Sequence, residues 1–375
     1  MTQSPTRLMI GASESAADLL YATRFFAPDP FFWIEHQGRT SAGFTALEVD
    51  RARATASVDS VLSITALQQR LKKQLGRPVT VADLALVHLE KLGVRRIVVP
   101  GWTDAASVRT LEAGGLRVEI ATTHFFPLRQ IKTPHEIEAI TQALRAAEAG
   151  LARGLDILGQ ASIGARGQLR WNRSTLTSEI LRGEIDATVI RSGAVPSHTI
   201  VACGAQACDP HERGSGPLFA HQTIILDIFP RSIASGYFGD LTRTVVKGKA
   251  PEPVRHLFST VAEGKRWALD RIRPGVSGKA IHDGLVRRFK EQGYPTVRKQ
   301  GRWTGFFHGT GHSLGLEIHE APRFADTDFP PGLVMTVEPG LYDPAIGGVR
   351  LEDLIVVTPT GLRNLTKAPE FLEIP

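Results

Sequence analysis

The chain of 375 residues has little cysteine, and the cysteine that it has is poorly placed for a staple or a structural metal. Its two cysteines, Cys203 and Cys208, do not form a CxxC pair, and no second pair could complete a zinc site. A chain of this length with two cysteines is not held together by disulfides. We therefore expect two reduced thiols and a reducing compartment.

Long apolar runs and clustered charge are also missing. No run approaches the roughly 20 apolar residues that a membrane-spanning helix needs, and the first residues lack an apolar segment followed by a cleavage site. These absences predict a cytoplasmic protein without membrane association. The net charge is +6, but Lys and Arg are scattered along the chain, so nucleic-acid binding is not expected.

The first third of the chain alternates apolar strands with stretches of helical spacing. Strands are predicted at "RLMIGA", "FFWIEH", "RRIVVPG" and "RVEIAT", and helices at "VADLALVHLEKLGV" and "DAASVRTLEAGGL". This alternation indicates an α/β domain, to which we assign residues 1–130. The domain contains no catalytic constellation.

A strong helix start opens the second domain, residues 131–375. Thr133 is a predicted N-cap, Pro134 takes the first helical position, and Glu136 closes a capping box. A long apolar stripe follows at helical spacing. The next segment, 159–174, is rich in glycine and polar residues and is predicted to be a loop.

The second domain contains a faint internal repeat. Two stretches about one hundred residues apart each begin with a hydroxyl residue and continue with one apolar helical face. They are Thr177, Leu181, Ile185 and Val189, and Ser277, Ile281, Leu285 and Phe289. The pattern predicts a domain built from two similar halves with a site between them.

Three histidines lie within the thirteen residues "HGTGHSLGLEIHE", at 308–320, although the chain has only twelve. Carboxylates that could accompany them lie in or at the ends of four apolar strands. Asp227 ends one strand and Asp240 opens the next, while Glu338 ends a third and Glu352 is predicted inside the strand that returns. Each pair can share one face of a hairpin.

Buried carboxylates require a compensating positive charge. Arg243 and Arg350 are close in sequence and are the ordinary candidates. The alternative is metal. Four carboxylates and one imidazole form an oxygen-rich set that favours manganese, cobalt, iron or zinc over a thiolate-held structural zinc, and five side chains suit two ions because carboxylates can bridge.

From about residue 130 to the C-terminus, the chain resembles the pita-bread metallopeptidases, the M24 family that includes methionine aminopeptidase, prolidase and aminopeptidase P. The resemblance is carried by "LDIF…GYFGDLTRT", "HGTGHSLGLEIHE", "TVEPGLY" and "RLEDLIVV". The first domain resembles the creatinase/prolidase N-terminal domain, which points to the proline-specific members. The implied fold class is an α/β N-terminal domain followed by an α+β pita-bread catalytic domain with a pseudo-two-fold repeat.

The resemblance implies a ligand set and a chemistry. Asp227 would bind one ion, His312 and Glu338 the other, and Asp240 and Glu352 would bridge both. Manganese is the favoured metal, with cobalt, zinc and iron as alternatives. A water held between the ions as hydroxide would be the nucleophile, and Glu338 would pass a proton to the leaving proline nitrogen.

The same resemblance implies substrate residues. His308 and His319 would line the pocket, and His211 in "CDPHERGSG" matches a further pocket histidine; these three, with Glu338, are the predicted catalytic set. Arg350 and, more weakly, Tyr342 match substrate-binding positions. The implied enzyme is an Xaa-Pro dipeptidase or Xaa-Pro aminopeptidase that acts on a small peptide with proline in second position, as a homodimer.

The sequence departs from the family pattern in two places. Asp227 and Asp240 are thirteen positions apart, two more than is usual in the family, and the segment 159–174 is longer than expected and could cover the cleft. The even change in the Asp227–Asp240 spacing preserves strand parity.

Two alternative functions are considered. They are a creatinase-like C–N hydrolase acting on a small guanidino compound and a pita-bread binding module without activity; the complete ligand set favours neither.

Overall fold

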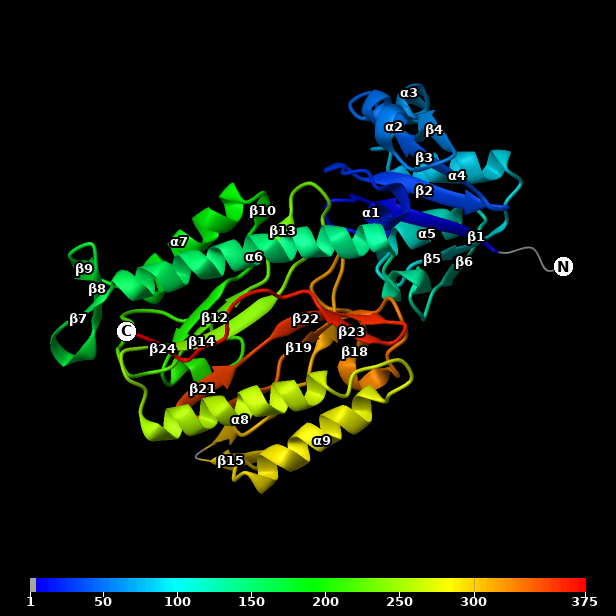
Figure 1. Ribbon diagram of the computed structural model, residues 1–375. Coiled ribbons are helices and arrows are strands. Elements are labelled where there is room, and N and C mark those ends of the chain that lie inside the picture. Colours follow the sequence, from blue (N-terminus) through cyan, green and yellow to red (C-terminus); the bar gives the residue numbers. More distant parts are fainter. Residues whose placement is uncertain (1–4, 300) are drawn as a thin grey trace. The chain divides into compact units, whose positions relative to one another are not determined.

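A computed structural model describes residues 5–299 and 301–375. The chain divides into two compact units, residues 1–129 and 130–375 (Figure 1). Within the described residues, no helix combines the length and the apolar character that a membrane span requires.

The N-terminal unit is built on a six-stranded mixed sheet with the order β4-β3-β2-β1-β5-β6. Its strands are β1 (Thr6–Gly11), β2 (Phe31–His36), β3 (Arg39–Phe44), β4 (Ser60–Ser63), β5 (Arg96–Val99) and β6 (Arg117–Ile120). Its helices are α1 (Ala17–Thr23), α2 (Val49–Thr55), α3 (Thr65–Leu75), α4 (Val81–Lys91) and α5 (Ala105–Ala113), and the short 3-10 segment η1 (Pro127–Gln130) lies at the boundary. The strands and helices predicted in this part of the sequence are confirmed.

Alternating side chains of the central strands enter two separate cores. Leu8 of β1 packs in one core with Leu84 of α4, whereas its neighbour Met9 packs in the other with Leu19 of α1. Successive residues of a strand point to opposite faces, so both faces of this sheet are covered and the unit is an α/β layer structure.

The C-terminal unit has four long helices in two pairs. They are α6 (Pro134–Gln160), α7 (Ser178–Arg191), α8 (Glu252–Leu269) and α9 (Gly278–Glu291). The predicted caps are confirmed: Thr133 and Glu136 form a reciprocal capping box at α6, and the hydroxyls of Thr177 and Ser277 accept backbone N–H bonds at the starts of α7 and α9.

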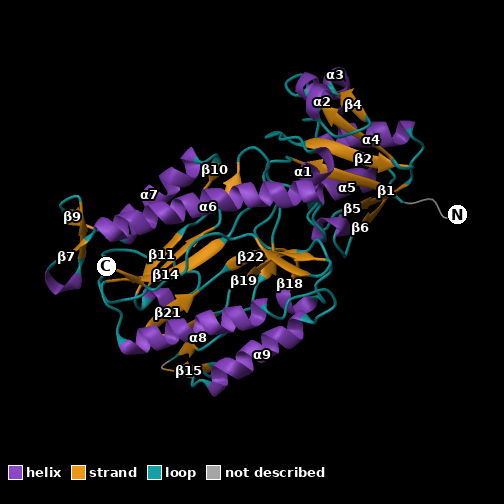
Figure 2. Ribbon diagram, in the orientation of Figure 1, coloured by secondary structure: helices purple, strands orange, loops and turns teal. Residues whose placement is uncertain are grey.

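Two sheets lie between the helix pairs (Figure 2). The first has the order β11-β12-β14-β24 and the second β18-β17-β19-β22-β23. Their strands are β11 (Ile200–Cys203), β12 (Ile224–Ile228), β14 (Leu241–Lys247), β17 (His312–Ser313), β18 (Glu320–Arg323), β19 (Val334–Val337), β22 (Asp353–Thr358), β23 (Gly361–Asn364) and β24 (Glu373–Ile374).

Smaller pieces connect these elements. Two-stranded ribbons are formed by β10 (Ala194–Val195) with β13 (Arg231–Ser232), by β15 (Val297–Lys299) with β16 (Arg302–Thr304), and by β20 (Gly340–Asp343) with β21 (Gly347–Arg350). The 3-10 segments are η2 (Ala165–Gly167), η3 (Gln206–Cys208) and η4 (Phe324–Asp326).

The order of elements repeats, as the sequence predicted. The helix pair α6–α7 precedes β11, β12 and β14, and the pair α8–α9 precedes β17, β19 and β22. Glycines permit close helix contacts in both pairs: a Cβ at Gly154 would lie 3.0 Å from Ile185 Cδ1, and one at Gly264 would lie 2.6 Å from Phe289 Cε1. In Figure 1 the two pairs flank the central strands from opposite sides.

The prediction of an irregular loop at 159–174 was wrong. The segment contains the end of α6 and a three-stranded sheet of β7 (Ser162–Ile163), β8 (Leu169–Trp171) and β9 (Ser174–Thr175). Strands this short leave almost no periodic signal. The sheet lies at the C-terminal end of α6 (Figure 1), and the Lys247 ammonium donates to the Gly159 carbonyl at 2.9 Å. The small sheet of β7, β8 and β9 therefore adjoins the C-terminal end of β14, which is the end remote from Asp240.

Candidate metal centre

The first pair of carboxylates projects from one hairpin. In the antiparallel register of β12 and β14, Asp227 lies opposite Thr242. Asp240 precedes Thr242 by two residues, so its side chain points to the same face. The longer connection between the two aspartates therefore preserves their shared orientation, as strand parity predicts.

The second pair projects from β19 and β22. Val337 lies opposite Asp353, so the next step of the register sets Glu338 opposite Glu352. The prediction that Glu352 sits inside the returning strand was wrong by one position, because Leu351 and Glu352 form a short link between β21 and β22. The Glu352 backbone N–H instead donates to the Thr242 carbonyl across the sheets, at 3.1 Å.

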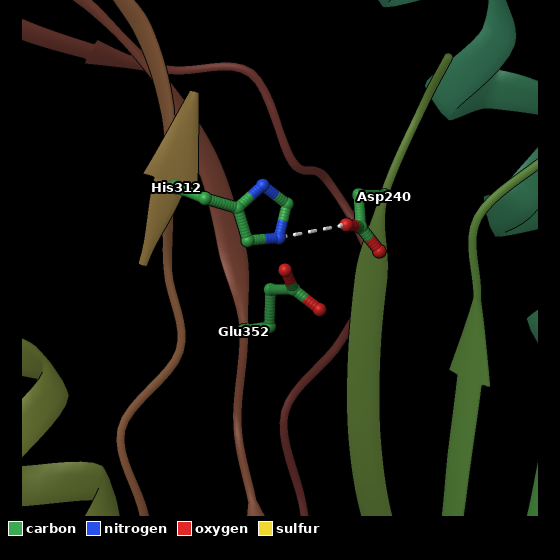
Figure 3. Close-up of side chains that lie close together, drawn as sticks. All are labelled: Asp240, His312 and Glu352. Atoms are coloured by element: carbon green, nitrogen blue, oxygen red, sulfur yellow. Dashed lines mark ion pairs between the residues drawn. The ribbon is translucent and has the colours of Figure 1, made fainter. Parts of the chain in front are cut away.

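His312 connects the two pairs. Its Nε2 lies 3.6 Å from Asp240 Oδ2 and 3.4 Å from Glu338 Oε1. Ligand atoms of Asp240, His312 and Glu352 all lie within 4.8 Å of one another. Figure 3 shows these three side chains converging from β17, from the start of β14 and from the link before β22.

The protonation of His312 suits a metal ligand. Burial lowers the pKa of His312 to about 4, so the ring is neutral at pH 7. Its Nδ1 lies 3.2 Å from the Ser313 carbonyl oxygen, a pure acceptor, so Nδ1 carries the proton. The lone pair of Nε2 therefore faces the carboxylates, and a ring held through Nδ1–H is typical of histidine ligands.

The carboxyl groups around His312 carry unfavourable electrostatics. Burial, and then the charges of the neighbouring carboxylates, raise the pKa of Asp240 and of Glu352 well above their ordinary values. Burial also raises the pKa of Glu338 to about 7, although the charge of Arg350 opposes the change. Like charges gathered in a low-dielectric site require a cation.

Asp227 is oriented differently from the other carboxylates. Its Oδ2 accepts a hydrogen bond from Arg350 Nη2 at 2.7 Å. This is the ordinary charge pairing that the sequence left open, and it applies to one carboxylate of the four. The other suggested partner, Arg243, points away from the site, because its Nη2 lies 2.9 Å from Asp353 Oδ1.

The donor set fits divalent metal. One guanidinium contacts one carboxylate, while Asp240, Glu338 and Glu352 surround an imidazole nitrogen whose lone pair points at them. Carboxylate oxygens with a single imidazole are the ligands that Mn²⁺, Co²⁺, Fe²⁺ and Zn²⁺ accept. A pair of cations would remove the repulsion that raises the pKa values of these carboxyl groups.

A hydrogen-bonded chain extends from Arg350 to His308. Arg350 Nη1 donates to the Tyr342 hydroxyl at 3.2 Å, and that hydroxyl lies 2.8 Å from His308 Nε2. His308 Nδ1 donates to the Gly309 carbonyl, and burial lowers the pKa of His308 to about 3. The neutral ring therefore accepts the Tyr342 proton, so three predicted substrate residues are connected.

The two remaining predicted histidines, His211 and His319, have ring nitrogens without hydrogen-bond partners among the described residues. The ring of His319 packs edge-on against that of His312, with centroids 4.4 Å apart. His211 lies in an exposed loop, and burial is the main cause of the lowered pKa values of His308 and His319. Among the described residues, neither ring has a hydrogen-bond partner through its nitrogens.

Two threonines hold the ligands and were missed by the sequence analysis. Thr242 donates to Glu352 Oε2 at 2.7 Å, and Thr336 donates to Glu338 Oε1 at 3.1 Å. Thr242 follows Asp240 by two residues and Thr336 precedes Glu338 by two. Strand parity alone could have identified both.

A third missed contact comes from a helix. His282 of α9 lies 2.8 Å, through Nδ1, from the hydroxyl of Thr310 in the histidine-rich segment. The Thr310 carbonyl accepts the Glu338 N–H at 2.8 Å. No sequence pattern connects residues 28 positions apart in this way.

Comparisons with known proteins agree with this geometry. The model of metallopeptidase family M24 matches residues 129–359. The Xaa-Pro dipeptidase of Pyrococcus furiosus is 31% identical over 252 residues, which cover 65% of this chain and 65% of that protein, slightly under two thirds of its length.

Solved structures resemble the whole chain. The X-Pro aminopeptidase of Thermotoga maritima has a TM-score of 0.83 at 22% identity, covering 99% of this chain and 97% of the other. The Xaa-Pro dipeptidase of Bacillus anthracis has a TM-score of 0.82 at 24% identity, covering 99% and 95%. These likenesses confirm the predicted fold class, an α/β domain followed by a pita-bread domain.

Proposed function

The chain belongs to metallopeptidase family M24, and on that premise we propose that it is a dinuclear metal-dependent peptidase that hydrolyses the bond before proline. The observation that carries the proposal is the convergence of Asp240, His312 and Glu352, with the unprotonated Nε2 of His312 directed at carboxylate oxygens. The named relatives and structural neighbours support proline as the residue after the cleaved bond.

Five side chains would hold the metal. Two divalent ions supply Lewis-acid polarisation of the scissile carbonyl and activation of water. The donors are those that the sequence predicted: Asp227, Asp240, His312, Glu338 and Glu352. Asp227 would exchange part of its interaction with Arg350 for the metal, while Thr242 and Thr336 keep Glu352 and Glu338 oriented.

Glu338 is proposed to move the proton. A carboxylate at a metal centre can take a proton from the attacking water and pass it to a leaving group within hydrogen-bond reach. Glu338 Oε1 lies 3.4 Å from His312 Nε2 and accepts the Thr336 hydroxyl bond. It would deliver a proton to the departing proline nitrogen.

His319 and His211 are proposed to contact the substrate carbonyl. Both rings have unengaged nitrogens in the described structure, so each can donate an N–H to an oxygen that becomes negative during attack. The imidazole of His319 lies against the ligand His312, which sets it at the edge of the metal centre.

Aromatic rings would receive the proline. His308 and Tyr342 have ring centroids 5.5 Å apart, and Phe307 and Tyr342 5.1 Å. Tyr342 is fully buried, so the partly exposed rings of His308 and Phe307 offer the apolar area to a pyrrolidine ring, which has no N–H to satisfy once it is in a peptide bond. Arg350 Nη1 donates to the Tyr342 hydroxyl at 3.2 Å and so fixes its position.

The finer assignments are part of the same proposal. Manganese is the metal to be tested first, with cobalt, zinc and iron as alternatives. A cytoplasmic location and a homodimer stay predictions from the sequence and its resemblance.

The decisive experiment combines metal analysis with a substrate panel. The purified protein should contain up to two ions per chain and should hydrolyse Ala-Pro with added Mn²⁺, but not Ala-Ala or Met-Ala. Chelation should abolish the activity, and Mn²⁺ should restore it. Asp240→Asn and His312→Gln should lose activity and bound metal with an unchanged circular dichroism spectrum. A metal-free protein that ignores Ala-Pro would overturn the proposal.

A further inference from the structure

A surface cavity of about 570 Å³ lies in the C-terminal unit, in the size range of small-molecule sites. One wall comes from the segment 205–212 and the other from the segment 301–307. The residues that line it have no part in the metal centre or in the proton transfer described above.

Residues that line this cavity are adjacent in sequence to residues of the proposed substrate site. Pro210 and Glu212 line the cavity, and His211 lies between them; Phe307 lines it, and His308 follows. Each wall is therefore one residue away from a histidine proposed to contact the substrate.

Two contacts confirm that the cavity and the site adjoin. The Pro210 carbonyl accepts a hydrogen bond from Arg350 Nη1 at 3.3 Å. The ring of Phe307 packs on that of Tyr342, with centroids 5.1 Å apart. Arg350 thus contacts Asp227 of the metal centre and the cavity wall at Pro210, and Tyr342 contacts Arg350 and the cavity wall at Phe307.

The wall from β16 offers a cation and an aromatic face. Arg302 is exposed, and its guanidinium has no hydrogen bond or ion pair among the described residues. The side chain of Trp303 is 51% exposed. Both residues line the cavity, and Arg298 Cζ lies 5.7 Å from the centroid of the Trp303 ring. A free guanidinium and an exposed indole on one wall suit a carboxylate attached to an apolar or long side chain.

The wall from the 205–212 segment is acidic. Asp209 accepts the His211 N–H through Oδ1, and Glu212 accepts the Gly214 N–H through Oε1. Each carboxylate has its second oxygen uncommitted within the described chain. This wall is therefore complementary to a positively charged side chain.

We propose that this cavity binds the residue that follows proline in substrates longer than a dipeptide. The inference rests on the proposed function, since it takes the proline beside His308. The α-carboxylate of the third residue pairs with Arg302, its side chain packs on Trp303, and a basic side chain reaches Asp209 and Glu212. The preferred substrates are Xaa-Pro-Lys and Xaa-Pro-Arg peptides.

The test compares four peptides with the Mn²⁺-loaded protein: Ala-Pro, Ala-Pro-Ala, Ala-Pro-Lys and Ala-Pro-Glu. Ala-Pro-Lys should give the highest kcat/KM. Arg302→Gln and Trp303→Ala should each lower kcat/KM for the tripeptides about tenfold through KM, and change that for Ala-Pro by less than about twofold. Arg287→Gln, an exposed guanidinium on α9 outside the cavity, is the matched control and should change neither.

A double variant tests the acidic wall. Asp209→Asn with Glu212→Gln removes both negative charges but keeps oxygens that can accept the loop N–H bonds. The preference for Lys over Glu at the third position should therefore disappear, while Ala-Pro-Ala is cleaved as before. Calorimetric titration with Ala-Pro-Lys should show the same loss as weaker binding. Cleavage of the peptides without any selective effect of these variants would overturn the cavity proposal alone, whereas no cleavage of any of the four peptides would overturn the proposed function itself.

Discussion

Arg350 Nη2 donates a hydrogen bond to Asp227 Oδ2 at 2.7 Å, and both side chains are almost fully buried. The contact joins β21 to β12, one from each half of the repeat. It gives the carboxylate set one fixed positive charge, which partly offsets the effect of burial on the pKa of Glu338. The remaining carboxyl groups depend on protons or on metal.

Replacing Arg350 by Met should expose this dependence. Truncating one partner of a buried ion pair costs about 3 kcal/mol, so the chelated variant should unfold at lower urea than the chelated parent. Added Mn²⁺ should stabilise the variant more than the parent, because the variant has more uncompensated charge. Urea unfolding with and without metal measures both effects. Equal stability of the two chelated proteins would contradict the expected role, and Arg287→Met is the exposed control.

The stability of the chelated protein should fall as the pH rises. Burial and neighbouring charges raise the pKa of Asp240, and that of Glu338 reaches about 7. The folded state then binds more protons than the unfolded state, so stability is full below about pH 4 for these groups and declines through the folded pKa values. Urea unfolding in chelator at pH 5 and pH 8 measures the decline.

Asp240→Asn removes one of these charges without changing the shape of the side chain. The variant should decline less between pH 5 and pH 8, and should be more stable than the chelated parent at pH 8 by about 1–2 kcal/mol. Asp29→Asn, at an exposed position of the N-terminal unit, should leave the pH dependence unchanged. A parent protein whose stability rises over this range would refute the electrostatic account.

His282 should act as a positioning residue for the histidine-rich segment. Its contact with Thr310 holds the loop whose carbonyl binds the Glu338 N–H. His282→Leu should lower kcat about tenfold with little change in KM, because misplacement of a reacting group acts on the chemical step. Asn at this position should recover part of the loss.

Steady-state kinetics and metal analysis together distinguish this role from simple destabilisation. The metal content of His282→Leu should equal that of the parent at saturating Mn²⁺. His256→Gln, an exposed histidine on the neighbouring helix α8, should behave as the parent. A uniform loss of metal and of activity in the Leu variant would assign His282 a structural role instead.

Shortening the small sheet at 162–175 should not affect substrate length. The sheet adjoins the end of β14 remote from Asp240, so replacing residues 164–174 by a short Gly-Ser turn should leave kcat/KM within about twofold for both Ala-Pro and longer peptides. The replacement also removes Leu169, which is fully buried, so a lower melting temperature is expected. A change in kinetics confined to long peptides would restore the idea of a cover over the cleft.

Much of the fold was predictable because its signals are local. Thr133 and Glu136 satisfy each other at the start of α6 within four residues, and the hydroxyls of Thr177 and Ser277 announce α7 and α9 in the same way. Short apolar runs identified β1 and β2. The ligand candidates lie at strand ends, where an acidic residue after an apolar run is conspicuous.

What could not be predicted depends on contacts between distant segments. The small sheet at 162–175 is made of strands of two or three residues and is held partly by bridges to the segment 217–219. The His282–Thr310 contact and the orientation of Asp227 toward Arg350 exist only once helices and sheets are assembled. The spacing of apolar residues along the chain does not reveal contacts of this kind.

The duplicated order of helices and strands has a consequence for how the protein matures. Asp227 and Asp240 belong to the first copy of the repeat, and His312, Glu338 and Glu352 to the second. A nascent chain that has made only the first copy has two of the five proposed ligands and lacks His312, so it would bind a divalent cation weakly. Tight retention of a divalent metal would thus begin only when the second copy has been synthesised, and metal binding would then stabilise the contact between the two copies.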